Sequence, residues 1–221
     1  MAKETKIINL SENSSLISQW VSELRDVSIQ GDRMRFRRNL ERIGEAIAFE
    51  ISKILPYKKA DIQTPLGIHH SSILAEQPVL CTILRAGLPL HQGMLNYFDQ
   101  ADNSFMAAYR KHTDDTHFEI SLEYVSCPDL TDRILIISDP MLATGASLVR
   151  SVDQLKSQGK WKELHIVCAI ASKSGINYVA EACPDATIWC ADVDESLSDK
   201  GYILPGLGDA GDLAFGTKMQ H

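Results

Sequence analysis

The segment that most constrains the fold begins at Ile134 and ends at Ser147, where the sequence reads Ile-Leu-Ile-Ile-Ser-Asp-Pro-Met-Leu-Ala-Thr-Gly-Ala-Ser. It opens with an uninterrupted apolar run, which is typical of a strand buried on both faces. An acid, a loop of small residues and a helix-length segment follow. A strand that leads into a helix in this way is the unit from which parallel sheets are built.

The rest of the chain repeats this alternation of strands and helices. β-rich runs lie at 79–84, 104–109, 133–138, 164–171 and 187–190, and helix-length segments lie at 147–158 and 175–182. We therefore predict an α/β fold with a mostly parallel central sheet flanked by helices.

Three segments add to this core. Apolar residues recur at steps of three and four between residues 33 and 55, as far as Pro56, so residues 1–60 are predicted to form an N-terminal helical extension. The polar segment 112–124 contains alternating apolar residues and predicts a hairpin or β-arm. From Gly201 onward the chain is rich in loop residues. No linker or repeat divides the sequence, and we expect one domain over residues 1–221.

Composition restricts the function. The chain has 22 Lys and Arg against 29 Asp and Glu, and the resulting net charge of -7 disfavours nucleic acid as a partner. The five cysteines form no Cys-x-x-Cys pair, which argues against a zinc site or a disulfide framework. No stretch approaches the roughly 18 apolar residues of a membrane span, and the N-terminus lacks an apolar signal region. We expect a soluble cytoplasmic protein that binds a small ligand.

The small residues at 143–147 are suited to hold a phosphate. They would let backbone N–H groups close on an anion at a helix N-terminus, where the helix dipole favours negative charge. Asp139, at the end of the strand, can accept hydrogen bonds from a sugar diol. A Walker loop is excluded because no Gly-Lys-Ser/Thr follows. The alternative is an ordinary strand-to-helix turn.

A second pattern places Arg85 at the end of the apolar strand 79–84, with Ala86 and Gly87 after it. Arginine is rarely buried without a partner. Its planar fork, together with the N–H groups of two small residues, would suit a pyrophosphate. The alternative is a surface arginine paired with a carboxylate, and Arg110 taken by itself favours that alternative.

Glycine and aspartate cluster between Gly201 and Asp212. Gly206, Gly208 and Gly211 match the Gly-x-Gly-x-x-Gly dinucleotide fingerprint, but only ten residues follow Gly211. The βαβ unit that this fingerprint requires cannot form in so short a segment. The glycines instead permit a tight loop whose backbone groups approach a flat ligand closely, and a purely structural loop is the alternative.

Three motifs together resemble the uracil phosphoribosyltransferase family. They are Ile-Leu-Arg-Ala-Gly-Leu at 83–88, Asp-Pro-Met-Leu-Ala-Thr-Gly-Ala-Ser at 139–147, and Gly-Tyr-Ile-Leu-Pro-Gly-Leu-Gly-Asp-Ala-Gly-Asp at 201–212. The second is similar to the 5-phosphoribosyl 1-diphosphate (PRPP) motif of type I phosphoribosyltransferases, with Pro140 in place of a second acid. The resemblance implies the type I phosphoribosyltransferase fold, a base-binding hood at 201–217, and the reaction of uracil with PRPP to give UMP and pyrophosphate in pyrimidine salvage.

The resemblance also implies the roles of individual residues. Arg85, Arg110, Asp139 and Asp209 would be catalytic, with both arginines on the pyrophosphate and Asp209 on PRPP or its Mg²⁺, the implied cofactor. Uracil would be held by Ile203, Gly208, Asp209 and Ala210, largely through backbone groups. PRPP would be bound by Arg85, Ala86, Gly87, Arg110, Asp139, Pro140, Met141, Leu142, Ala143, Thr144, Gly145, Ala146, Ser147 and Asp209.

Three positions depart from the family's usual pattern. Ala146 stands where a second glycine is usual, Leu213 replaces a common arginine, and Ser126-Cys127-Pro128 replaces Lys-Leu-Pro. Leu213 and Ser126 each remove a positive charge near the expected site, so GTP is no more than a candidate effector. Family members commonly form dimers or higher oligomers, which implies a homodimer or a larger homo-oligomer.

Three rival functions stay open on the sequence. They are phosphoribosyl transfer to another base, RNA binding by a regulator that keeps the same fold, and a scaffold without activity. The glycine-rich motif argues against the first, the acidic charge against the second, and the presence of Arg85, Asp139 and Asp209 against the third.

Overall fold

The computed structural model describes residues 5–112 and 118–218, and the side chains of residues 5–107 and 124–218. Its helices are α1 Leu16–Arg25, α2 Arg33–Ser52, α3 Leu88–Tyr97, α4 Ala146–Leu155, α5 Lys173–Ala182 and α6 Ala210–Phe215, with a short 3-10 helix at Lys156–Gln158. Its strands are β1 Lys6–Asn9, β2 Tyr57–Thr64, β3 Gly67–Leu74, β4 Val79–Leu84, β5 Asp102–His112, β6 Phe118–Ser126, β7 Ile134–Ser138, β8 Met141–Leu142, β9 Glu163–Ser172, β10 Thr187–Asp194, β11 Ser196–Leu197 and β12 Ile203–Leu204.

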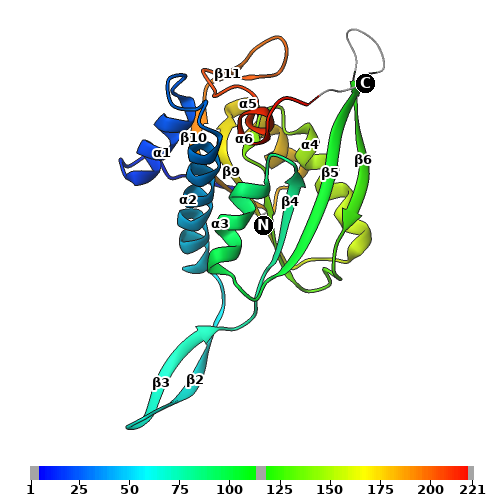
Figure 1. Cartoon of the computed structure of the whole chain (residues 1–221). Helices are drawn as coiled ribbons and strands as arrows, with labels where there is room; N and C mark the ends of the chain where they lie inside the picture. Colours follow the sequence, from blue (N-terminus) through cyan, green and yellow to red (C-terminus); the bar gives the residue numbers. More distant parts are fainter. Residues whose placement is uncertain (1–4, 113–117, 219–221) are drawn as a thin grey trace.

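The central sheet has the order β1-β10-β9-β7-β4-β5-β6, and the short β8 pairs with β9. Figure 1 labels β10, β9, β4, β5 and β6 of this sheet. All neighbours in it are parallel except β5 and β6. The predicted α/β class and mostly parallel sheet are confirmed. Within the described residues, no helix is both long and apolar enough to cross a membrane.

The sheet is buried on both faces, which explains the unbroken apolar run in β7. Ile134 and Ile136 belong to a core shared with α1, α2 and α3, whereas Leu135 and Ile137 belong to a second core shared with α4 and α5. Because successive side chains of a strand point to opposite faces, both sets must be apolar when helices cover both sides.

The N-terminal region differs from its prediction in two places. The helices α1 and α2 are present, but residues 1–60 are not wholly helical: β1 adds a parallel edge strand beside β10, and β2 begins at Tyr57. β2 and β3 form an antiparallel hairpin that projects from the body of the molecule (Figure 1). The sequence did not indicate this hairpin because both of its faces are largely exposed, and so it lacks the alternating apolar pattern of a half-buried strand.

The segment 112–124, predicted as a hairpin or arm, belongs to a second hairpin. β5 and β6 pair antiparallel from Phe105 opposite Ser126 to His112 opposite Phe118, and residues 113–117 lie outside the described residues. This hairpin extends the central sheet at its edge.

Candidate active site

Two of the three motifs follow neighbouring strands and therefore meet at one edge of the sheet. β4 and β7 run parallel, with Thr82 opposite Ser138. Arg85 follows the first strand and Asp139 follows the second, so both lie beyond the carboxyl ends of the strands, where ligands of open α/β sheets bind. Gly87 fits between the two loops because it has no side chain: a Cβ there would lie 3.1 Å from the Ser138 carbonyl oxygen and would collide with the Thr82 hydroxyl.

The phosphate-type loop ends at Gly145, which has a φ of 80° and immediately precedes α4. A Cβ at Gly145 would lie 3.1 Å from the Gly175 carbonyl oxygen, so both conformation and space require glycine. Ala146, which stands where a second glycine is usual in the family, is the first residue of α4 and has no left-handed φ, so alanine is compatible with this loop. Its N–H donates to the Thr144 hydroxyl over 3.3 Å. Apart from this contact, no side chain of the described residues caps α4, which leaves other N–H groups of its first turn available to an anion.

The start of α5 supports this loop from the side of β9. The Ser172 hydroxyl donates to the Ala143 carbonyl at 2.6 Å and accepts from the Gly175 N–H at 2.9 Å. The Pro140 carbonyl accepts from two β9 residues, Ala169 and Ile170, at 3.1 and 3.0 Å. The loop that would surround a phosphate is therefore held to β9 by hydrogen bonds to its backbone carbonyls.

Asp139 is an unusually basic carboxylate. Its backbone N–H donates to the Val167 carbonyl at 3.0 Å. Burial raises the pKa of Asp139 to about 7, although the Met141 N–H donates to its carboxyl and opposes that change. The residue as a whole is half-buried. Near neutral pH this carboxyl can exist as an anion that accepts hydrogen bonds from the hydroxyls of a sugar.

The glycine-rich hood contacts the Arg85 loop directly. Arg85 Nη2 donates to Asp212 Oδ1 at 2.6 Å and to the Gly216 carbonyl at 2.7 Å. A Cβ at Gly211 would lie 3.5 Å from Arg85 Nε and 3.7 Å from Ala86 Cβ. Arg85 is therefore paired with a carboxylate, as its alternative interpretation expected, but the partner belongs to the third motif.

The start of the hood lies beside the phosphate-type loop. A Cβ at Gly201 would stand 3.5 Å from Thr144 Cγ2. The hood thus reaches both of the other motifs, one at each end of its own segment. Motifs that are separated by more than fifty residues in the sequence form one group in the fold.

Of the residues expected to hold uracil, Ile203 and Ala210 have buried side chains, Gly208 has none and Asp209 is half-buried. Ile203 and Ala210 are each 3% exposed and belong to the core with α2. Gly208 is exposed, with a φ of 97°. Asp209 caps α6, because its Oδ1 accepts from the Asp212 N–H at 2.9 Å. This arrangement leaves backbone groups to face a ligand.

The structure does not test the predicted contacts of Arg110, Met141 and Leu142 with PRPP. Arg110 lies in β5 opposite Ile120, but its side chain is not among those that the structure describes, so its contact with pyrophosphate stays a prediction. Met141 and Leu142 form β8, and their backbone pairs with β9 in the sheet. Their contact with PRPP also stays a prediction.

Two arginines that hold the hood were not indicated by the sequence. Arg25 donates to the Gly206 carbonyl at 3.0 Å and Arg37 donates to the Ala214 carbonyl at 2.7 Å. Their partners lie 181 and 177 positions further along the chain. No local pattern distinguishes such residues from ordinary basic residues on the surface of a helix.

The comparisons with known proteins decide the family. Residues 11–217 match the family model described as Uracil phosphoribosyltransferase, a range that contains all three motifs. The chain is 49% identical over 215 residues to the uracil phosphoribosyltransferase of Porphyromonas gingivalis, covering 97% of this chain and 100% of that one. It is 36% identical over 212 residues to the uracil phosphoribosyltransferase of Thermococcus gammatolerans, covering 95% and 93%.

The chain belongs to the uracil phosphoribosyltransferase family. Its fold agrees with that of a solved structure, the AQ2163 protein from Aquifex aeolicus, with a TM-score of 0.83 and 31% identity over 97% of this chain and 100% of that one. The family resemblance indicated by the three motifs is therefore confirmed, and the match extends over the whole length of the Porphyromonas gingivalis enzyme.

The raised pKa of Asp139 predicts how Asp139→Asn changes stability with pH. Because this pKa is about 7 in the fold and 3.8 in its ordinary state, the folded protein binds more protons than the unfolded chain between these pH values. The stability that this group contributes is present below the lower value and is lost as the pH rises through the higher one. Asparagine keeps an acceptor for the Met141 N–H but carries no charge to bury.

We expect Asp139→Asn to be more stable than the parent by about 1–3 kcal/mol at pH 8, with the difference disappearing near pH 4. Urea denaturation of the ligand-free protein at both pH values measures it. Asp153→Asn, at an exposed carboxylate on α4, is the matched control and should show no such gain. If Asp139→Asn changed the free energy of unfolding by the same amount at pH 4 and pH 8, burial would not be the cause of the raised pKa of Asp139.

Proposed function

We propose that this protein joins N1 of uracil to C1 of the ribose of PRPP, forming UMP and releasing pyrophosphate. The observation that carries the proposal is the direct contact between Arg85 and the hood through Asp212 and the Gly216 carbonyl, at 2.6 and 2.7 Å. It joins the loop suited to pyrophosphate with the loop suited to a base. Between them, the loop at 143–147 offers N–H groups to the 5'-phosphate.

The chemistry requires stabilisation of a departing pyrophosphate. The C1–O bond breaks with its electron pair leaving on the pyrophosphate, and the ribose develops oxocarbenium character before N1 bonds to C1 and its proton passes to solvent. A fixed cation beside the leaving oxygens lowers the barrier because it meets charge that grows in the transition state. Arg85 is suited to this role because Nη2 is held by the hood, while Nε is buried and has no hydrogen-bond partner among the described residues.

Ribose and phosphate would be held at the carboxyl edge of the sheet. Asp139 would accept hydrogen bonds from the ribose hydroxyls, and the N–H groups at the start of α4 would donate to the 5'-phosphate. The backbone of Pro140, Met141 and Leu142 holds this loop against β9. Arg110 would reach the pyrophosphate from β5.

Base selection would rest on backbone groups. Uracil presents two carbonyl acceptors on either side of an N–H donor, whereas cytosine reverses two of these groups. Fixed N–H and C=O partners in the backbone at 208–210 and at Ile203 would be left unpaired by cytosine, and unpaired buried polar groups are costly. The buried side chains of Ile203 and Ala210 help to fix that backbone.

Mg²⁺ fits the donor set of the hood. No group of three or more His, Cys, Asp or Glu side chains that could hold a metal occurs among the described residues. Mg²⁺ is commonly bound by one or two carboxylates together with the phosphates of a substrate. Asp209 uses Oδ1 to cap α6, and the described residues place no hydrogen bond on its second oxygen. Asp209 and the diphosphate would hold the ion, which would neutralise charge on the leaving group.

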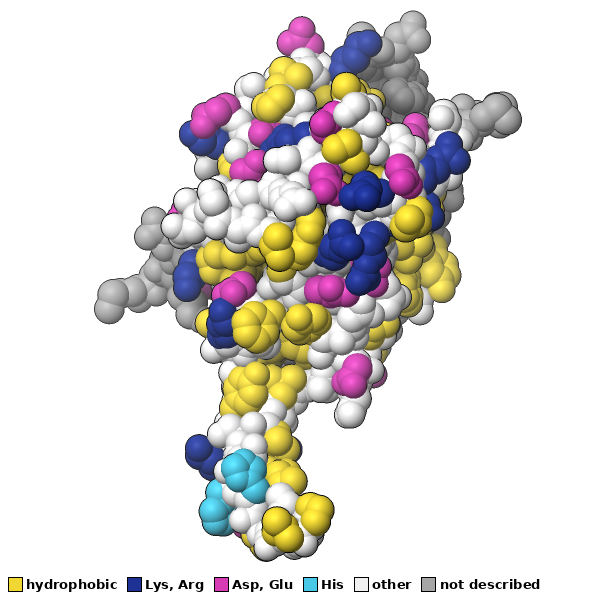
Figure 2. Space-filling model, turned by 60° about the vertical axis from the view of Figure 1, so that its left-hand side comes forward, with side chains coloured by type: hydrophobic (Ala, Val, Ile, Leu, Met, Phe, Trp, Pro, Cys, Tyr) yellow, Lys and Arg dark blue, Asp and Glu magenta, His cyan; other side chains and the backbone are white. Residues whose placement is uncertain are grey.

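We further propose that the protein acts as a homodimer or larger homo-oligomer in the cytoplasm. The β2–β3 hairpin carries exposed apolar side chains along its length, with Leu66 fully exposed and Ile68 61% exposed (Figure 2). Exposed apolar patches of this kind commonly mark association surfaces. All five cysteines are free, which suits a reducing compartment. GTP is a candidate effector that the activity assay can include.

The substrate assignment is tested with a panel of bases. The protein is incubated with PRPP, Mg²⁺ and either uracil, cytosine, adenine or hypoxanthine, and the nucleotide product is identified by mass. We expect UMP with uracil and poor turnover with the other three. If one of those three bases matched the kcat/KM of uracil, the assigned specificity would be wrong.

Arg85→Ala tests the pyrophosphate contact. Loss of a charge-assisted contact that strengthens as pyrophosphate departs should cost about 2–4 kcal/mol of transition-state stabilisation in kcat/KM. Asp212→Asn removes the charge of the hood partner but keeps Arg85, and should cost less. Arg133→Ala, which breaks an ion pair with Asp102, is the matched control. If Arg85→Ala and Asp212→Asn lowered kcat/KM equally, Arg85 would serve only to hold the hood in place and would not stabilise the departing pyrophosphate.

Asp209→Asn tests whether Asp209, which caps α6, also helps to hold Mg²⁺. Asparagine caps helices about as well as aspartate, so α6 should persist, but an amide does not replace a carboxylate beside Mg²⁺. We expect kcat to fall about tenfold or more with the preference for uracil over cytosine retained. Steady-state kinetics over a range of Mg²⁺ measures this, with Asp32→Asn at the cap of α2 as control. Lost base discrimination with unchanged Mg²⁺ dependence would mean that the Asp209 side chain reads the base.

The oligomeric state is measured by light scattering of the purified protein. We expect a mass at least twice that of the 24.5 kDa chain. The double change Leu66→Asp and Ile68→Asp should reduce that mass, because charges would replace apolar side chains at the contact. A parent protein that is monomeric would refute the oligomer, and a variant of unchanged mass would refute the role of the hairpin.

A further inference from the structure

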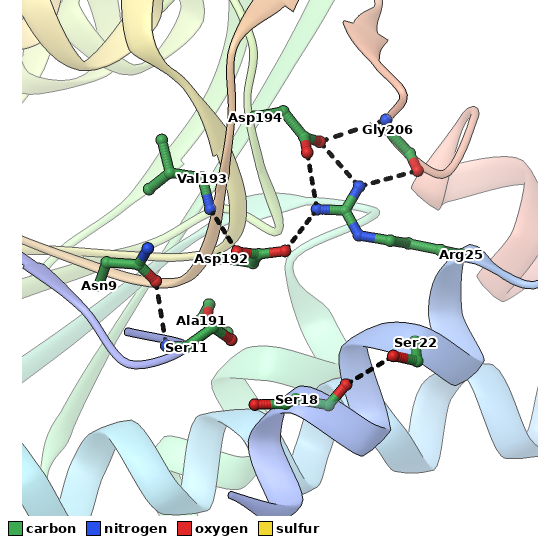
Figure 3. Close-up of polar contacts among 10 residues, drawn as sticks. All are labelled: Asn9, Ser11, Ser18, Ser22, Arg25, Ala191, Asp192, Val193, Asp194 and Gly206. Atoms are coloured by element: carbon green, nitrogen blue, oxygen red, sulfur yellow. Dashed lines mark hydrogen bonds and ion pairs between the residues drawn. The ribbon is translucent and has the colours of Figure 1, made fainter. Parts of the chain in front are cut away.

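Arg25, the last residue of α1, joins the N-terminal helices to the hood (Figure 3). Its Nη1 donates to Asp194 Oδ2 at 2.7 Å and to the Gly206 carbonyl at 3.0 Å. Its Nη2 donates to Asp192 Oδ2 at 2.8 Å and to Asp194 Oδ1 at 3.0 Å. The Gly206 N–H donates to Asp194 Oδ2 at 3.2 Å. One ion pair therefore fixes both backbone polar groups of Gly206.

The ion pair is held away from solvent. The side chains are 18% exposed for Arg25 and 7% exposed for Asp194. Burial by itself would lower the pKa of Arg25, but hydrogen bonds to Asp194 and Asp192 outweigh it and raise that pKa. The planar fork of arginine presents two nitrogens that donate to both carboxylates and to the carbonyl, whereas the three donors of a lysine ammonium share one nitrogen and cannot reproduce this bidentate geometry. The geometry therefore requires arginine and not merely a positive charge.

A second contact from the same region holds the next residue of the hood. Gln30 Nε2 donates to the Leu207 carbonyl at 3.3 Å, as well as to the Leu24 and Arg25 carbonyls at 3.0 and 3.1 Å. The Leu207 side chain is 5% exposed and packs in the core with α2. The carbonyls of two successive hood residues are thus both held by α1 and the turn that follows it.

These anchors stand immediately before the loop expected to read the base. Gly208 is exposed and has a left-handed φ of 97°, so its conformation depends on how the residues on either side are held. Gly206 and Leu207 are fixed before it, and Ala210 is buried after it. Within the described residues no hydrogen bond or ion pair joins Arg25 to Arg85, Asp139 or the loop at 143–147.

We propose that Arg25 is a positioning residue for base recognition. Through Gly206 and Asp194 it sets the backbone at 208–210 against which uracil is read, and it acts without touching the sites for phosphate and pyrophosphate. The proposal rests on the proposed function, because it assumes that the base lies against this loop. It predicts that damage to Arg25 weakens binding of the base selectively.

Two ligands that share the ribose and its 5'-phosphate, one with uracil at C1 and one with a hydroxyl there, test the proposal. UMP and ribose 5-phosphate are titrated calorimetrically into the parent protein and into Arg25→Lys. We expect the affinity for UMP to fall about tenfold or more in Arg25→Lys, because small displacements of positioning groups have effects of this size. The affinity for ribose 5-phosphate should stay within about twofold. In steady-state kinetics, the KM for uracil should rise while the KM for PRPP is unchanged.

Controls separate positioning from a loss of folding. Arg35→Lys makes the same change at an ion pair between α2 and Glu23 of α1 that does not reach the hood, and it should leave both affinities unchanged. Gln30→Ala keeps the Arg25 ion pair and should lower the affinity for UMP less, in the same direction. A purely structural role would reduce the number of binding sites per chain without changing the dissociation constants.

The outcomes are distinguishable. Equal losses of UMP and ribose 5-phosphate affinity, an unchanged affinity for UMP, or a reduced number of sites at unchanged affinity would each overturn the proposal. If Arg25→Lys did not fold, the selective loss in Gln30→Ala would carry the test, and an unchanged affinity there would overturn the proposal. A parent protein that forms no UMP from uracil and PRPP would instead refute the proposed function.

Discussion

The parallel pairing of β4 with β7 is the constraint on which the rest of the site depends. Parallel strands end at the same edge of a sheet, so the loops that follow them are brought together whatever their distance in the sequence. Gly87 then allows these two loops to approach closely, because a side chain there would collide with Thr82 and approach the Ser138 carbonyl. Arg85 and Asp139 consequently lie on one side of the sheet, where a phosphoribosyl ligand can meet a cation and a carboxylate together.

The central sheet holds the hood through Asp194 of β10, which accepts from the Gly206 N–H. The hood is also held by the pairing of β12 with β11, by side chains from the N-terminal helices and by Arg85. Arginine holds it at three points because the guanidinium fork can bind backbone carbonyls and carboxylates simultaneously. The helical region at the N-terminus thereby supports the hood and also covers one face of the sheet. In the proposed function, the phosphoribosyl group would face the ends of the strands and the base would face the hood.

The sequence predicted the features that arise from local patterns. The strands at 79–84, 133–138, 164–171 and 187–190 were placed within a few residues, because burial on both faces requires a continuous apolar run. The three motifs were found because their small residues and charges lie close together in the chain. The β2–β3 hairpin was missed because neither of its faces is buried. Arg25 and Asp194 were missed because their pairing joins positions 169 residues apart, and no local pattern records such a contact.

In the proposed function, the loops at 85–87, 139–147 and 203–210 form one site, in which the first two face the phosphoribosyl group and the last faces the base. A crystal structure of the protein with bound UMP tests it most directly. We predict the 5'-phosphate against the N–H groups at the start of α4, the ribose hydroxyls at Asp139, and the uracil ring against the backbone of Ile203 and residues 208–210. A UMP molecule bound with its base away from the hood, or with its phosphate away from α4, would contradict this claim.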